Sequence, residues 1–401
     1  MPEAVIVAAA RSPIGRAYKG SLRDMRADDL AVAMVRAALE QVPQLDPAGI
    51  DELFLGCAQP AGEQGHGLAR VVTVLLGLDG VGGPTVQRYC ASSLQTTRMA
   101  LHAIRSGEGS VFVSAGTEAV SRYGLGKADG MPGTHSPHFA AAEAAAAAVD
   151  RWADPRARGE LPNVYVAMGQ TAENVAQRYG VSRVEQDEFA LRSQHRAEKA
   201  VADGFWACDI TPVTLPDGTV VDADDCPRAG TTLDGLAGLK PAFRAGGTVT
   251  AGNACPLNDG AAALVIMSDV RAAELGIAPL ARIVSTGVSA ISPEIMGVTP
   301  IEATRRALAN AGMSIADLDL VEINEAFAAQ VVPCVRELGL DPSVVNVHGG
   351  AIAVGHPFGM TGARITTTLL HGLEWQDKEI GLETMCAAGG QGMAMVVQRL
   401  S

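Results

Sequence analysis

Cys386 is the residue whose surroundings first suggest chemistry. It opens the stretch Cys-Ala-Ala-Gly-Gly-Gln-Gly, which lies between a segment of strand length and the apolar run from Met393 to Val397. This pattern predicts a strand, a glycine turn and a second strand. Glycine-rich backbone beside a thiol can point its N–H groups at a ligand. Taken alone, the pattern still favours a buried structural cysteine over a reactive one.

Cys90 is the second candidate thiol. It stands in Gln-Arg-Tyr-Cys-Ala-Ser-Ser, immediately before a predicted helix over residues 94–105. The positive end of a helix dipole favours a thiolate, so Cys90 is the best candidate nucleophile in the first half of the chain. The alternative is a small residue that packs a helix start, with Ser92 or Ser93 as a simple cap.

Asn324 and His356 add an amide and an imidazole. Asn324 opens Asn-Glu-Ala-Phe after a predicted strand, and His356 lies in Gly-His-Pro within the glycine-rich segment 346–359. An imidazole near a thiol can act as its base. The alternatives are a strand-end cap for Asn324 and a histidine that satisfies loop carbonyls for His356. The glycine pairs at 349–350 and 389–390 lack the context of a phosphate-binding loop.

Two similar units are predicted to position these residues. Predicted strands and helices alternate over residues 4–116, after which the pattern is interrupted. It continues with a strand at 258–267, and the alternation begins again at residue 280. Such alternation is typical of a layered, mainly parallel α/β sheet. Segment 50–56 resembles segment 318–324 in pattern, which indicates an internal duplication with a site where the halves meet. We expect an N-terminal half over 1–119 and 258–272, an insertion over 120–257, and a C-terminal half over 273–401.

The composition excludes several classes of protein. With 401 residues, 48% hydrophobic residues and a net charge of −13, the chain is globular and lacks the basic face of a nucleic-acid binder. No apolar stretch is long enough to span a membrane, and no secretory signal is visible at Met1. Seven cysteines without a Cys-x-x-Cys pair predict neither a metal site nor a disulfide framework. We therefore expect a cytoplasmic protein.

Together, these stretches resemble the thiolase family along nearly the whole chain. Further matching stretches are Gln170–Val175, Lys240–Phe243, Thr250–Asn253 and Asn258–Ala262. The resemblance implies the thiolase fold: two similar mixed-sheet α/β halves in five layers (αβαβα), with an inserted loop domain that binds coenzyme A. It implies a homodimer at least, with a tetramer left open. It implies no metal and no cofactor, with coenzyme A and acyl-CoA as substrates.

The resemblance also assigns roles to the candidate residues. Cys90 would be the acylated nucleophile, activated by His356, and Cys386 would be the acid and base for the departing or attacking group. His356 and a water held by Asn324 would stabilise the enolate oxygen. The N–H groups of Cys90 and Ala388 would hold the second oxyanion. The reaction would be thiolytic cleavage of 3-ketoacyl-CoA, reversible as a Claisen condensation.

Residues for substrate and coenzyme A binding follow from the same resemblance. They are Met168, Arg228, Thr231, Phe243, Ala254, Cys255, Met296 and Phe327.

Four positions depart from the usual family pattern. Ala388 replaces a glycine, which would strain the turn if that position needs a positive φ. Ala167 stands where thiolases specific for acetoacetyl-CoA often have a histidine. Cys255 and Gly235 each replace a serine. These changes favour a degradative enzyme of broader substrate range.

Four alternatives stay open at this point. The first is a catalytically silent thiolase-fold carrier of acyl-CoA or lipid, for which only Ala388 is an argument. The second is a thiolase restricted to acetoacetyl-CoA. A decarboxylating ketoacyl synthase would pair its cysteine with two histidines, whereas the last position here is Cys386. A cysteine hydrolase would explain neither the second cysteine nor the inserted segment.

Overall fold

The computed structural model describes residues 1–125, 133–148 and 151–401. The first half of the chain forms one end of a ten-stranded sheet, in the strand order β1-β8-β5-β3-β4, and β2 pairs with β8. The bounds of these strands are β1 Ala4–Arg11, β2 Gly15–Arg16, β3 Glu52–Gly56, β4 Thr85–Val86, β5 Val111–Ala119 and β8 Asn258–Ser268. The helices of this half are α1 Ala27–Glu40, α2 Leu68–Leu75, α3 Ser92–Ser106 and α9 Asp269–Leu275.

The second half repeats this topology. Its strands run in the order β9-β12-β11-β10, and the pairing alternates in the same way: antiparallel, antiparallel, parallel. The elements are β9 Ala281–Ala290, β10 Leu320–Ile323, β11 Ile380–Ala387, β12 Gln391–Arg399, α10 Thr299–Ala311, α11 Ala328–Leu338, α12 Ala351–Val354 and α13 Thr361–Trp375. The duplication predicted from the segments 50–56 and 318–324 is confirmed, because these segments form the equivalent strands β3 and β10.

The two halves join edge to edge through β1 and β9. Only two residue pairs are registered across this seam, Val5 with Arg282 and Ile6 with Ala281. The mixed sheet expected in each half is present, and the seam makes the two a single hydrogen-bonded sheet. The prediction of a mainly parallel sheet from the alternation of strands and helices is wrong, because most strand pairs of the large sheet are antiparallel and only β3–β4, β3–β5 and β10–β11 are parallel. The short contact allows the halves to twist away from each other, so that helices can fit between them.

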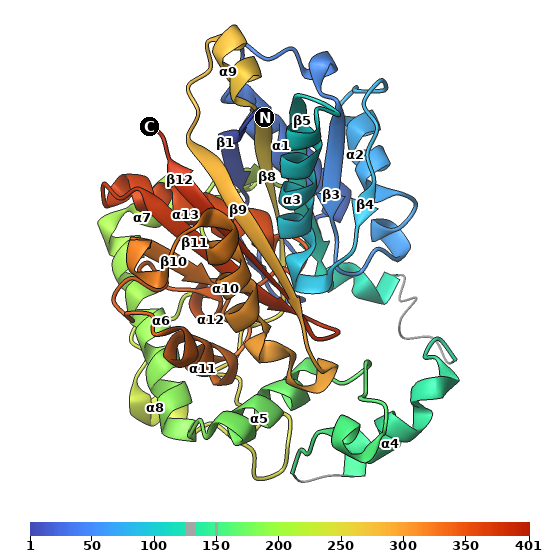
Figure 1. The fold of residues 1–401 in the computed structure, drawn as a ribbon, viewed down its shortest axis with the longest axis vertical. Coiled ribbons are helices and arrows are strands. Elements are labelled where there is room, and N and C mark those ends of the chain that lie inside the picture. Colours follow the sequence, from blue (N-terminus) through green and yellow to red (C-terminus); the bar gives the residue numbers. More distant parts are fainter. Residues whose placement is uncertain (126–132, 149–150) are drawn as a thin grey trace.

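The expected five layers are present (Figure 1). One apolar core lies between the first half-sheet and α1 and α2, and includes Leu30, Met34 and Leu68. A second core fills the middle, where α3 and α13 pack between the half-sheets. A third lies between the second half-sheet and the helices α10 and α11. The fully buried strands therefore read as apolar runs, such as Ala261–Met267 in β8.

The central helices α3 and α13 approach each other very closely at their N-terminal ends. A Cβ atom on Gly362 would lie 2.2 Å from the backbone nitrogen of Leu94, so only glycine fits here. One residue further on, the N–H of Ala363 donates a hydrogen bond to Ser93 Oγ at 2.9 Å. This crossing brings together the loops that precede the two helices.

Between β5 and β8, the described residues form helices and a small hairpin outside the large sheet. They are α4 Ala140–Ala148, α5 Met168–Tyr179, α6 Arg183–Asp203, α7 Phe205–Asp209, α8 Leu233–Ala237, and the paired strands β6 Val213–Thr214 and β7 Val220–Val221. The turn between β6 and β7 contains Pro216, Asp217 and Gly218, a combination typical of hairpin turns. Helix α4 lies in the alanine-rich tract 139–149, and the last residue of this tract, Val149, is outside the described residues. In Figure 1, α4 stands apart from both halves.

No helix in the described part of the chain is both long and apolar enough to cross a lipid bilayer.

Candidate active site

Cys90 lies in a strained turn between β4 and α3. The turn is a short 3₁₀ helix, Tyr89–Ala91, and Tyr89 adopts a φ of +46° that bulky residues rarely tolerate. Ser92 stabilises it: its Oγ accepts the N–H of Arg88 at 2.9 Å and donates to the Tyr89 carbonyl oxygen at 2.6 Å. Strain of this kind persists only when the surroundings enforce it, and it is common at functional sites.

The thiol of Cys90 is nearly buried, with 8% of the residue exposed. Burial raises the pKa of Cys90 to about 12, although the backbone N–H groups of Cys90 and Ala388, which face the sulfur, oppose the rise. The prediction that the helix start favours a thiolate is therefore wrong for the resting protein. Loss of hydration outweighs the helix dipole, so Cys90 is a neutral thiol that needs a base.

The turn after β11 supplies the second N–H at Cys90. Positive φ angles occur at Gly389 (+75°) and Gly390 (+79°), but not at Ala388. A Cβ on Gly390 would lie 2.2 Å from the carbonyl oxygen of Ile291, so this glycine is required. The methyl group of Ala388 causes no backbone strain. Its N–H keeps its position, and the concern raised by the sequence at this residue disappears.

His356 is 1% exposed and has a defined tautomer. Thr361 Oγ1 donates its single proton to the Pro357 carbonyl oxygen at 2.7 Å, so it accepts from Nδ1–H of His356 at 2.6 Å. The other ring nitrogen, Nε2, is then the unprotonated one. Burial, aided by the nearby Arg364 charge, lowers the pKa of His356 to about 3, so the ring is a neutral base at ordinary pH.

Asn324 faces the basic nitrogen of His356. Its Nδ2 donates to Nε2 at 3.2 Å, and the residue is 1% exposed at the end of β10. Its Oδ1 is buried and has no hydrogen-bond donor among the described residues. A buried carbonyl without a donor is costly unless a ligand or solvent molecule supplies one. This geometry suits the predicted role of Asn324 in holding a water.

Three residues that the sequence analysis did not single out fix the loop around His356. Asn258 Oδ1 accepts the N–H of His356 at 2.9 Å, and Thr361 holds Nδ1 as described. Glu118 Oε2 accepts the N–H of Gly359 at 2.8 Å and that of Ala58 at 2.8 Å. A hydroxyl one turn after the histidine could have indicated Thr361. Asn258 opens the matching stretch Asn258–Ala262, but its contact with His356 spans 98 residues, and no local signal indicates Glu118, whose contact with Gly359 spans 241 residues.

Cys386 is fully buried at the end of β11. Burial, followed by the neighbouring Cys90 thiol, raises the pKa of Cys386 well above its ordinary value. It packs in an apolar cluster with four of the predicted substrate residues, Met168, Ala254, Met296 and Phe327. The ring of Phe243 stands edge-on to Phe327 at 5.9 Å. Tertiary packing therefore gathers four of the eight predicted substrate residues in one cluster with this thiol, and a fifth, Phe243, contacts one of the four.

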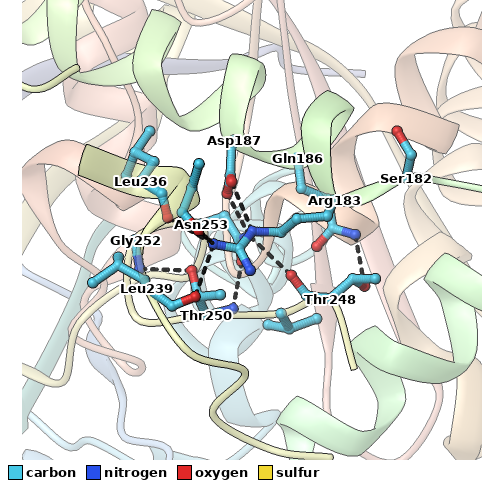
Figure 2. A network of polar contacts seen from close by, with 12 residues as sticks. Ser182, Arg183, Gln186, Asp187, Leu236, Leu239, Thr248, Thr250, Gly252 and Asn253 are labelled. Atoms are coloured by element: carbon cyan, nitrogen blue, oxygen red, sulfur yellow. Dashed lines mark hydrogen bonds and ion pairs between the residues drawn. The ribbon is translucent and has the colours of Figure 1, made fainter. Parts of the chain in front are cut away.

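A polar network holds the segment that leads into this cluster (Figure 2). Arg183 donates to Asp187 at 2.7 Å and to the Leu236 carbonyl oxygen at 2.6 Å. Asp187 in turn accepts from Asn253 Nδ2 at 2.9 Å. The next residue, Ala254, forms a β-bridge with Phe327. The network thus fixes α6, the end of α8 and the Thr250–Asn253 loop around the substrate cluster.

Cys255 follows directly, and its N–H donates to the Ala326 carbonyl oxygen at 3.1 Å. Burial, then the nearby Cys90 thiol, raises the pKa of Cys255. Cys255 is therefore a neutral thiol beside the nucleophile.

Arg228 and Thr231 lie outside the apolar cluster, in an exposed loop. Thr231 Oγ1 donates to the Arg228 carbonyl oxygen at 2.7 Å, which holds the loop closed. The N–H of Arg228 donates to Gln194 at 2.9 Å. Their contact with coenzyme A stays a prediction.

A cavity of about 840 Å³ lies between α4, α5 and the loop around Phe243. Its wall includes Ala167, Asn174 and Glu294, the last of which lies two residues before Met296 of the apolar cluster. The catalytic candidates do not line it. Of the predicted substrate residues, Phe243 lines it. Within the described parts of the chain, no group of three or more His, Cys, Asp or Glu is arranged to hold a metal ion.

The chain matches two known family descriptions over nearly its whole length. Residues 4–270 match "Thiolase, N-terminal domain" and residues 277–399 match "Thiolase, C-terminal domain".

Individual relatives match it from end to end. The chain is 44% identical to the 3-oxoadipyl-CoA/3-oxo-5,6-dehydrosuberyl-CoA thiolase of Escherichia coli (strain K12), with full coverage of both chains. It is 41% identical to the 3-ketoacyl-CoA thiolase of Bacillus subtilis (strain 168), covering 99% and 100%. The crystal structure of the Bacillus anthracis acetyl-CoA acetyltransferase superimposes with a TM-score of 0.86 at 40% identity, covering 100% of this chain and 99% of that one.

Proposed function

This chain belongs to the thiolase family and is an acyltransferase, and we propose that Cys90, His356 and Cys386 perform its reaction. The reaction is thiolysis of a 3-ketoacyl-CoA by coenzyme A to acetyl-CoA and a shortened acyl-CoA. In the reverse direction it is a Claisen condensation.

In acylation, Cys90 gives its proton to Nε2 of His356 while its sulfur attacks the ketone carbon. The transfer accompanies the attack because the buried thiol is neutral at rest and Nε2 is the unprotonated ring nitrogen. The bond between the ketone carbon and the α-carbon then breaks. The acyl group remains on Cys90 as a thioester, and the α-carbon leaves as the enolate of acetyl-CoA.

Cys386 acts as the acid for the leaving group and then as the base for the entering group. As a neutral thiol with a raised pKa, it donates its proton to the enolate carbon and releases acetyl-CoA. The resulting thiolate is a strong base for the same reason. It removes the proton of incoming coenzyme A, whose sulfur attacks the Cys90 thioester and forms the shortened acyl-CoA. The bond between the Cys90 sulfur and the acyl carbon breaks, and the released Cys90 thiolate takes its proton back from His356.

Two sets of donors match the charges that develop. The N–H groups of Cys90 and Ala388 face the sulfur, where the tetrahedral oxyanion forms. Once protonated, Nε2 of His356 can donate to the enolate oxygen, together with a water held by Asn324. Removal of one such donor typically costs about 2.7–4 kcal/mol of transition-state stabilisation.

The observation that supports this proposal most directly is that the N–H of Ala388 faces the sulfur of Cys90. It joins the Cys386 turn to the nucleophile and provides the oxyanion site. The test is intact-mass analysis after incubation with acetyl-CoA, followed by peptide mapping. We expect an acetyl adduct on Cys90 that is absent from Cys90→Ser. Bound coenzyme A without an adduct would contradict the proposal and favour a silent carrier.

The silent carrier loses its only argument, since Ala388 has no positive φ and all four catalytic candidates are present. An acetoacetyl-CoA-specific enzyme is less well supported than a broader one, because Ala167 leaves room at the cavity wall where a histidine would project. Relatives named for acetyl transfer, for 3-ketoacyl-CoA and for 3-oxoadipyl-CoA leave two acyl classes to compare. One ends in a methyl group and the other in a carboxylate.

Three expectations from the sequence complete the proposal. The enzyme would be a homodimer at least, would act in the cytoplasm, and would use coenzyme A as substrate without a bound cofactor. Sedimentation analysis and metal analysis of the purified protein test the first and the last.

A further inference from the structure

Resting on the reaction proposed above, we propose that Glu325 is a positioning residue of this active site. Its carboxylate ties the strand end that carries Asn324 to the loop that carries His356, and it acts on the reaction through these two residues. The quantity that it sets is the separation between Nδ2 of Asn324 and Nε2 of His356, which is 3.2 Å.

The carboxylate of Glu325 is enclosed by three hydrogen-bond donors, and the residue is 1% exposed. Oε1 accepts from Asn346 Nδ2 at 2.7 Å, and Oε2 accepts from Ser193 Oγ at 2.6 Å and from the N–H of Ile352 at 3.1 Å. Burial raises the pKa of Glu325, and the hydrogen bonds from these donors oppose the rise. Both oxygens serve as acceptors, which suits an ionised carboxylate.

Further contacts fix the direction of two of these hydrogen bonds. Ser193 Oγ accepts the N–H of Gly350 at 3.0 Å, so its single proton is directed at Glu325. Asn346 Oδ1 accepts the N–H of Ile323 at 2.8 Å, so Nδ2 is the amide atom that faces the carboxylate. The same Nδ2 also donates to the Ile323 carbonyl oxygen at 2.9 Å. The network therefore has one arrangement of donors and acceptors.

Asn346 holds the residue before Asn324 as well as the residue after it. It binds the backbone of Ile323 on one side and the side chain of Glu325 on the other. Asn346 also begins the glycine-rich segment that carries His356. The backbone on both sides of Asn324 is thus attached to the segment of His356, so a shift of either loop would move the other.

The glycine pair at 349–350 is shaped around the same carboxylate. A Cβ on Gly350 would lie 2.2 Å from the carboxyl carbon of Glu325. Gly349 has a φ of +86°, and a Cβ there would lie 2.7 Å from the carbonyl oxygen of Ser193. Only glycine fits at either position. Because Ser193 belongs to α6, the inserted segment is joined to both catalytic loops at this point.

The test begins with Glu325→Gln, which turns one acceptor oxygen into an NH₂ group that faces a donor. The network must then shift, and a displacement of catalytic groups by about 1 Å can lower a rate about 10²-fold. Thiolysis is measured with acetoacetyl-CoA and with 3-oxohexanoyl-CoA. We expect kcat to fall about 10- to 100-fold with the better substrate, while KM changes by less than about threefold.

A double-mutant cycle separates positioning from a general loss of structure. Asn324→Ala removes the amide whose place Glu325 sets, so the addition of Glu325→Gln to this variant should lower kcat further by less than about threefold. Two unrelated losses would multiply instead. The free energy of unfolding of each variant, measured by denaturant, shows how much structure is lost.

Asp319→Asn is the matched control. Asp319 lies just before β10, at the end away from the site, and its Oδ2 accepts the N–H groups of Glu379 at 3.1 Å and Ile380 at 2.8 Å. This variant should keep the wild-type kcat even where its free energy of unfolding falls. Ser193→Ala serves where Glu325→Gln does not fold, because it removes one donor and leaves the carboxylate. Its kcat should fall about three- to tenfold with little change in KM.

Three results would overturn the proposal: an unchanged kcat in Glu325→Gln or in Ser193→Ala, losses that multiply in the double variant, or an equal fall in kcat in Asp319→Asn. Failure of the wild-type protein to cleave either substrate would instead contradict the thiolase activity.

Discussion

The loop before α3 and the loop before α13 occupy equivalent places in the two duplicated halves, yet they present different chemistry. The first loop presents the thiol of Cys90 and the second presents the imidazole of His356. Gly362 and Leu94 allow the two helix starts to cross in close contact, which brings the two loops near each other. In the proposed mechanism, the duplication would therefore supply one active site with two complementary groups, rather than two equal sites.

The two loops achieve their shapes in different ways. The first places a tyrosine at a φ of +46° and relies on Ser92 to hold the turn. The second uses Gly355 at +112°, where a Cβ would lie 2.6 Å from the side chain of Ile14. Hydrogen bonds to the side chain of Ser92 thus stabilise the loop that carries Cys90, called the thiol loop below. Tight packing around Gly355 stabilises the loop that carries His356, called the imidazole loop.

The hairpin connections of the two halves differ as well. In the second half, β11 and β12 are joined by the short turn at Ala388, which delivers Cys386 and a backbone N–H. In the first half, the equivalent strands β5 and β8 are separated by the long insertion with Met168 and Phe243. By the proposed roles, the second half would contribute Cys386 and the N–H of Ala388, while the insertion in the first half carries most of the predicted substrate residues.

The largest effect should come from the thiol loop. Cys90→Ser should lower kcat by about 10⁴-fold or more, as loss of a catalytic nucleophile does elsewhere. Serine is too weakly acidic to give its proton to the neutral His356. The measurement is the steady-state rate of thiolysis, with Cys255→Ser as a control that keeps the nucleophile. A fully active Cys90→Ser variant would contradict the assignment of the nucleophile to the thiol loop and of the base to the imidazole loop.

A mutation in the imidazole loop should cause the second largest loss of activity. His356→Gln should lower kcat by about 10²–10⁴-fold, the usual contribution of a general base. The remaining rate should rise with pH between 7 and 9, since only solvent can then ionise a Cys90 whose pKa is about 12.

The wild-type pH profile tests the same loop without a mutation. Because the folded pKa of His356 is about 3, the ring stays neutral where a free histidine, with a pKa of about 6.5, would be protonated. kcat/KM should therefore show no acid limb near pH 6.5. The unfolded chain binds the proton more readily, so stability should fall as pH drops below about 6.5. An acid limb at pH 6.5 would mean that the imidazole of His356 is hydrated rather than buried.

The hydroxyls that support the two loops should give smaller and distinct effects. Thr361→Val removes the acceptor for Nδ1–H of His356 at nearly constant volume, and we expect kcat to fall about tenfold with little change in KM, a cost of about 1.4 kcal/mol for one hydrogen bond. Thr361→Ser should restore the rate. Ser92→Ala should instead lower the free energy of unfolding by about 1 kcal/mol, because it releases the strained turn. An equal fall in kcat in Thr361→Val and Ser92→Ala would contradict the expected difference between a kinetic and a structural role.

The smallest effect should come from the hairpin turn. Ala388→Gly should change kcat by less than about twofold, since no methyl strain exists to relieve and only backbone entropy changes. Gly390→Ala is the contrasting variant, and it should fail to fold stably because its Cβ would collide with the Ile291 carbonyl oxygen. A large gain in activity for Ala388→Gly would show that the alanine does disturb the oxyanion site.

The sequence by itself determined which residue types are available and the order of the elements. Cys90, Asn324, His356 and Cys386 were identified from motifs, because each lies beside a glycine turn or at the end of a predicted strand or helix. The duplication was visible because strands β3 and β10 keep the same apolar pattern. Local rules of this kind depend on neighbours in the chain, so they can be read without a structure.

Only the tertiary structure decided the chemical state of these residues. Burial made Cys90 a neutral thiol where the helix start predicted a thiolate, and Thr361 fixed the tautomer of His356. The shape of the turn at Ala388 depends on the close contact of Gly390 with Ile291, far away in the sequence. Hydration, hydrogen-bond partners and charge pairing are properties of packing, and packing exists only once the two halves and the inserted segment have come together.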